Sequence, residues 1–184
     1  QLSSIKKPIL WIHINYEKNS RVWESFGSRN SKELNQDYLY LTLRSIINKC
    51  GDYFHIVLFD DDSFCKLLDW GVDFNKVGGI QKQYLRTLGL VKILHKYGGM
   101  FIEPSFILFK SLEGLYNKVI QSQKMSVAEF LNKSSDSHIM HLMPSTSLMA
   151  CVKNCPVMDE FRNYLEILIS KDYTNESSIE GSIS

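Results

Sequence analysis

The chain has 184 residues, of which 44% are hydrophobic and 22% charged, as in an ordinary globular protein with a proper core. Its 21 basic and 20 acidic residues give a net charge of +1. This near balance excludes an electrostatic potential of a single sign that would attract nucleic acid. The longest apolar runs are too short to cross a bilayer. We expect one domain over residues 1–184, and its polar, Ser-rich end suggests that this domain continues beyond residue 184.

A strand, a helix and a second strand are predicted in the first third of the chain. Residues 5–14 (IKKPILWIHI) form an apolar run opened by a proline, which indicates a core strand. Residues 35–50 carry apolar side chains at helical spacing, and Gly51 closes that helix. Residues 54–59 (FHIVLF) form an apolar run of the length of a strand. A strand–helix–strand order with a short return predicts a parallel pair.

Three consecutive aspartates, Asp60, Asp61 and Asp62, follow the second predicted strand. Carboxylates at the carboxyl end of a strand can bind a metal ion or a base edge, but one of them is also needed to cap the helix that begins near Ser63. We assign ligand contact to Asp60 as one alternative, and capping and solvation to Asp61 and Asp62.

The central stretch begins with a connection over residues 72–82, where Gly78 and Gly79 favour a mobile loop. A helix follows, with apolar residues at three-residue steps from Leu85 to Tyr97, and Gly98-Gly99 ends it. Residues 100–102 are then a short buried strand, and Glu103 stands at its carboxyl end. Gly89 in the middle of the helix predicts a close approach by a neighbouring element, since glycine there costs about 1 kcal/mol relative to alanine.

The last third of the chain is predicted to contain two strands, residues 125–131 and 147–152, and a helix that Pro156 opens. Taken together, the elements predict a three-layer α/β domain of Rossmann-like type with a mostly parallel central sheet. Four cysteines (Cys50, Cys65, Cys151 and Cys155) follow no disulfide pattern, so we expect reduced thiols in a reducing compartment such as the cytoplasm.

Residues 90–112 (LVKILHKYGGMFIEPSFILFKSL) resemble the core of glycosyltransferases with the GT-A fold. The likeness is to the DXD-containing sugar-transferase and capsular polysaccharide synthesis families, in which a helix and a Tyr-Gly-Gly-like turn lead to an Asp-x-Asp or Asp-Ala-Thr-like motif. The first motif aspartate falls on Glu103 and the second acidic position on Ser105. An Asp and an Arg that the family carries in the preceding helix fall on Thr87 and Leu90. A looser resemblance is to proteins of large DNA viruses.

This resemblance implies transfer of a sugar from a nucleotide-sugar donor to a glycan or protein acceptor, with Mn²⁺ or Mg²⁺ held at Glu103. It implies donor contacts for Asp60, which would meet the base, and for Glu103 and Ser105. Arg86 is a further candidate, although it points about 100° away from the family's helix positions. Tyr16, in the loop after the first strand, could stack on the base or pin that loop to the core.

Two functions remain open at this point. One is the glycosyltransferase with an altered metal motif, and the other is an inactive domain of the same fold that serves as a structural or binding module. For Glu103 itself, the alternative to a metal ligand is a carboxylate that faces water at the end of a strand.

Overall fold

The computed structural model describes residues 6–14, 36–133 and 141–170, and these contain five strands and five helices. In chain order they are β1 (Ile9–His13), α1 (Gln36–Cys50), β2 (His55–Phe59), α2 (Asp61–Leu68), α3 (Gly79–Tyr97), β3 (Gly99–Ile102), α4 (Glu113–Ser122), β4 (Ser126–Leu131), β5 (Leu142–Cys151) and α5 (Pro156–Ser170). The mixed α/β class is therefore as predicted, and the elements that the sequence predicts occur in the predicted order.

The five strands form one sheet in the order β2-β1-β3-β5-β4. β1 is parallel to both β2 and β3, so the predicted parallel arrangement is confirmed for these three strands. β5 is antiparallel to β3 and to β4, which makes the sheet mixed.

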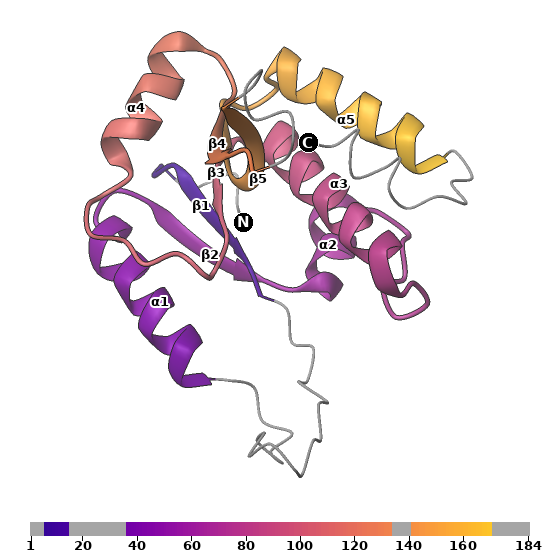
Figure 1. Ribbon diagram of the computed structural model, residues 1–184, viewed down its shortest axis with the longest axis horizontal. Coiled ribbons are helices and arrows are strands. Elements are labelled where there is room, and N and C mark those ends of the chain that lie inside the picture. Colours follow the sequence, from indigo (N-terminus) through magenta and orange to yellow (C-terminus); the bar gives the residue numbers. More distant parts are fainter. Residues whose placement is uncertain (1–5, 15–35, 134–140, 171–184) are drawn as a thin grey trace.

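Helices cover both faces of the sheet (Figure 1). The side chains of β1 alternate between the two cores that lie on these faces. Ile9 and Trp11 pack in a core with residues of α2, α3 and α5. Leu10 and Ile12 pack in the other core with residues of α1 and α4. This alternation follows from the two-residue period of a strand, and the predicted three-layer arrangement is confirmed.

The Gly98-Gly99 turn ends α3 where the sequence predicts it. Both residues have positive φ, 70° and 104°, which side-chain-bearing residues rarely adopt. A Cβ on Gly99 would collide with the carbonyl oxygen of Ile9 on the neighbouring strand. The indole N–H of buried Trp11 donates to the Gly98 carbonyl at 2.9 Å, which ties the turn to β1.

Gly89 is buried in α3, as its position predicts. A Cβ there would lie 2.6 Å from Cε1 of Phe64 on α2, so the absence of a side chain is what lets the two helices approach. One prediction in this region is wrong: α3 begins at Gly79, so residues 79–82 belong to the helix and not to the preceding loop.

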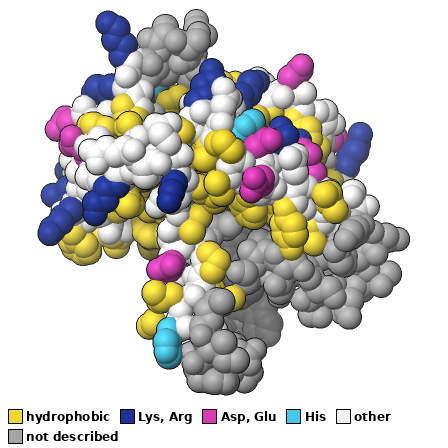
Figure 2. All heavy atoms as spheres, turned by 90° about the horizontal axis from the view of Figure 1, so that it is seen from above, with side chains coloured by type: hydrophobic (Ala, Val, Ile, Leu, Met, Phe, Trp, Pro, Cys, Tyr) yellow, Lys and Arg dark blue, Asp and Glu magenta, His cyan; other side chains and the backbone are white. Residues whose placement is uncertain are grey.

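The surface carries charges of both signs. On the face shown in Figure 2, basic and acidic side chains are interspersed with apolar ones. None of the helices in the described part of the chain is both long and apolar enough to cross a membrane. All four cysteines are unpaired, and burial raises the pKa of Cys151 to about 12.

Candidate functional site

The candidate site lies at the sheet edge where three parallel strands end. β1 ends at His13, β2 at Phe59 and β3 at Ile102, and because these strands are parallel their carboxyl ends share one edge. Asp60 and Glu103 directly follow two of them, which confirms that both carboxylates lie at this edge. Open α/β sheets bind their ligands at such edges.

Asp60 is the N-cap of α2. Its Oδ1 accepts from the backbone N–H of Ser63 at 3.1 Å and from the Ser63 hydroxyl at 2.6 Å. The Ser63 Oγ in turn lies 3.4 Å from the backbone N of Asp60, which completes a capping box. The capping role that we assigned to Asp61 and Asp62 therefore belongs to Asp60, because the helix begins at Asp61, which is earlier than that assignment requires.

Asp61 is the centre of a charged cluster that joins three elements. Its Oδ1 lies 2.9 Å from His13 Nε2 at the end of β1 and accepts from Arg86 Nε at 2.9 Å. Its Oδ2 accepts from Arg86 Nη2 at 2.7 Å and lies 3.6 Å from Lys82 Nζ. Both cations belong to α3 and are four residues apart, hence on one face of the helix. We call His13, Asp61, Lys82 and Arg86 the edge cluster.

Burial and charge act in opposite directions within the edge cluster. Burial of the Asp61 carboxyl raises its pKa, but the hydrogen bonds and charge of Arg86, with a further contribution from His13, hold that pKa below its usual range. For His13 burial is the larger effect and lowers the pKa, although Asp61 opposes it. Neutral His13 therefore donates its Nε2 hydrogen to Asp61, because a carboxylate can only accept.

The resembled families carry an Asp and an Arg at two helix positions, which are Thr87 and Leu90 in this chain. Neither residue brings a charge to this edge of the sheet. Leu90 is 8% exposed and belongs to the core between the sheet and α2, α3 and α5. The Thr87 hydroxyl donates to the carbonyl of Gln83 in its own helix. Arg86 is held by Asp61, so the charge of α3 at this edge comes from Lys82 and Arg86 instead.

Glu103 and Ser105 stand together at the end of β3. The Glu103 side chain is exposed while its backbone N–H donates to Ser147 of β5 at 3.0 Å. The Ser105 hydroxyl donates to Glu103 Oε2 at 3.4 Å. No group of three histidine, cysteine or acidic side chains that could hold a metal occurs in the described ranges. One carboxylate and one hydroxyl fit a cation that ligand phosphates also coordinate, but they do not fit a metal held by protein ligands alone.

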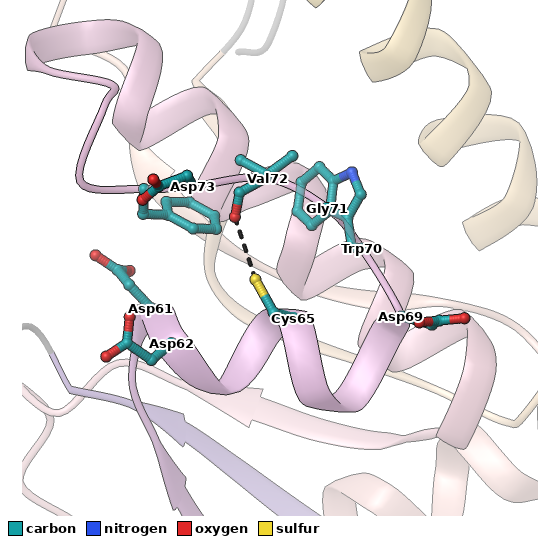
Figure 3. A pocket seen from close by; sticks show the side chains of 9 residues that line it. Asp61, Asp62, Cys65, Asp69, Trp70, Gly71, Val72 and Asp73 are labelled. Carbon is teal, nitrogen blue, oxygen red and sulfur yellow. Dashed lines mark hydrogen bonds between the residues drawn. The ribbon is translucent and has the colours of Figure 1, made fainter.

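An open pocket of about 530 Å³ adjoins the edge cluster, between α2 and the segment that follows it (Figure 3). Asp61 and Asp62 lie at one end of α2 and Asp69 at the other, while Asp73 comes from the segment opposite. The Cys65 thiol donates to the Val72 carbonyl at 3.2 Å between them. We call this the acidic pocket.

Of the candidate site residues, Tyr16 lies outside the described residues. The structure places Asp60, Arg86, Glu103 and Ser105 at or near one edge of the sheet, and Glu103 and Ser105 are in contact. His13 and Lys82 also belong to the site, although they were not among the residues predicted from the sequence. The signals that could have found them are the position of His13 at the carboxyl end of a buried strand and the four-residue spacing of Lys82 and Arg86.

Compared with known proteins, the chain matches no family model, and no curated protein is a significant match.

Proposed function

We propose that this chain is a glycosyltransferase domain of GT-A-like fold that binds a nucleotide-sugar donor at the edge formed by β1, β2 and β3. The observation that carries the proposal is the gathering of Glu103, Ser105 and the edge cluster at the carboxyl ends of three parallel strands. The acceptor would be a glycan or a protein, as the resemblance of residues 90–112 implies.

The chemistry requires that negative charge on the leaving nucleoside diphosphate be stabilised. Lys82 and Arg86 are positioned by Asp61 and supply cationic groups beside the ends of β1 and β2. A Mn²⁺ or Mg²⁺ ion, when bound with the donor, would be held by Glu103 beside the Ser105 hydroxyl and would neutralise phosphate charge. Asp60 contributes by fixing the start of α2, and a base contact of Asp60 or Tyr16 stays a prediction.

A second candidate is an inactive domain of the same fold that serves as a binding or structural module. The burial of Leu90 favours it, because a core leucine occupies the position of the families' arginine. Thr87 and Ser105 likewise bring no charge to positions that are acidic in the resembled families.

Calorimetric titration with UDP-, GDP- and CMP-sugars, with and without Mn²⁺, separates the two candidates. For the enzyme we expect saturable binding that Mn²⁺ strengthens. Glu103→Gln should weaken the Mn²⁺-dependent binding by about ten- to a hundredfold, since a charged interaction contributes about 1.5–3 kcal/mol. Glu160→Gln is the matched control, because Glu160 is an exposed glutamate on α5, away from this edge.

Ser105→Asp restores the families' second acidic position and should strengthen Mn²⁺ binding. If the unaltered protein binds no nucleotide sugar and Ser105→Asp restores none, the glycosyltransferase proposal is wrong and the inactive module takes its place.

A further inference from the structure

A second pocket, of about 400 Å³, lies beside the last turns of α3. α3 runs between α2 and α5 (Figure 1), and all three helices contribute to this pocket or border it. Because α3 ends at Tyr97 and β3 begins at Gly99, the pocket is near the amino ends of the strands, away from Glu103. Its size is in the range of small-molecule sites, about 300–1,000 Å³. We call it the basic pocket.

The charged side chains that line this pocket are mainly cationic. Lys92, Lys96 and Arg162 are basic side chains, His95 adds an imidazole, and Asp69 is the one carboxylate among the described lining residues. The carboxylates that pair with two of these cations lie outside the lining. Glu166 Oε1 is 2.8 Å from Lys92 Nζ, and Asp159 Oδ1 is 2.8 Å from Arg162 Nη2.

Contacts with other residues hold both lysines of the basic pocket in place. The Lys92 ammonium lies 4.8 Å from the centroid of the Trp70 ring, and its partner Glu166 fixes it from the other helix. The Lys96 ammonium donates to the carbonyl of Leu67, near the end of α2, at 2.8 Å. Cations that are already positioned lose less side-chain entropy when a ligand binds.

The hydrogen-bonding capacity of Arg162 is not met by its neighbours. Its Nε–H is buried and has no acceptor among the described residues. Its Nη2 donates to Asn163 Oδ1 at 3.1 Å, and the close contact with Asp159 lacks hydrogen-bond geometry. A guanidinium has five N–H donors, and buried donors are normally satisfied.

The dipole of α3 explains part of this arrangement. Basic side chains near the carboxyl end of a helix are stabilised by that dipole, which accounts for His95 and Lys96. It does not account for Arg162, which lies near the middle of α5, beyond the first turn on which the dipole of that helix acts.

We propose that the basic pocket binds a small molecule that carries a phosphate group. Lys92 and Lys96 would act as point charges, and Arg162 would hydrogen-bond to phosphate oxygens. The indole of Trp70 supplies an apolar wall beside the charges. This site is separate from the proposed donor site and does not depend on glycosyltransferase activity.

Titration of the whole chain with inorganic phosphate at constant ionic strength, followed by backbone and indole NMR shifts, tests this site. We expect saturable shifts at Trp70, Lys92, Lys96 and Arg162. Lys96→Gln and Arg162→Gln should each raise the Kd on the order of fivefold.

The matched control is Lys118→Gln, because Lys118 is exposed on α4, on the opposite face of the sheet, and should leave the Kd unchanged. Shifts that do not saturate, shifts confined to Lys82 and Arg86, or equal weakening by Lys118→Gln would each overturn the proposal. Thermal unfolding of each variant confirms that its fold is retained.

Discussion

Replacing Gly89 with alanine should destabilise the protein, although alanine is the better helix former. In an exposed helix the change would gain about 1 kcal/mol. Here the new Cβ would lie 2.6 and 2.7 Å from Cε1 and Cδ1 of Phe64, whereas carbon atoms in contact normally sit about 3.5–4 Å apart. One of the two helices, or the ring, must therefore move by roughly 1 Å.

The ring of Phe64 has little room to move. It is fully buried, and its centroid lies 5.3 Å from those of Phe59 and Phe74 and 5.4 Å from that of His13. Overpacking of a core costs about 1–3 kcal/mol, which exceeds the propensity gain. We expect a net loss of about 1 kcal/mol, or a fall in Tm of about 2–4 °C for a domain of this size.

Thermal and urea unfolding measure this effect, with Gly114→Ala as the control. Gly114 is in the first turn of α4, and nothing lies within 4 Å of the position of its Cβ. That variant should gain a fraction of 1 kcal/mol. In a Phe64→Leu background, Gly89→Ala should lose most of its cost, because the ring that it meets is gone. A rise in Tm for Gly89→Ala in the unaltered background would refute the reasoning.

Two further predictions concern the edge cluster and the turn before β3. Both His13 and Asp61 have lowered pKa values, so the stability that each contributes is present above its unfolded-state pKa and lost on acidification. As the pH is lowered, the free energy of unfolding should therefore decrease below about pH 6.5 because of His13, and decrease again below about pH 4 because of Asp61. In urea titrations, His13→Gln should flatten the first of these decreases. Asp61→Asn should lower the free energy of unfolding by about 2 kcal/mol, whereas Asp62→Asn, at an exposed position, should leave it almost unchanged. Equal Tm shifts for the two variants would contradict the edge cluster. Gly99→Ala should cost more than about 4 kcal/mol or abolish folding, because its Cβ meets the Ile9 carbonyl at a φ of 104°; a soluble variant with unchanged Tm would rule this out.

Elements whose signals are local could be predicted from the sequence alone. The helix periods of α1, α3 and α5, the apolar runs of β1 and β2 and the Gly98-Gly99 stop depend on residues within a few positions of one another. The same local order predicted the shared edge of Asp60 and Glu103, because parallel strands must end on one side. Gly89 was informative as well, since a costly residue requires a compensating contact.

Which aspartate caps α2 and which one forms the ion pairs depends on how the chain folds in three dimensions. One residue of helix register separates Asp60 from Asp61, and sequence patterns do not locate a helix start so finely. The direction of β5 also came from the fold, because a short apolar strand pairs in either sense. The edge cluster joins His13, Asp61 and Arg86, which are 48 and 25 residues apart, and their contact depends on how β1, α2 and α3 pack together. No local pattern encodes that packing, because the free energy that holds these charges together arises only when three distant elements exclude water from the same place.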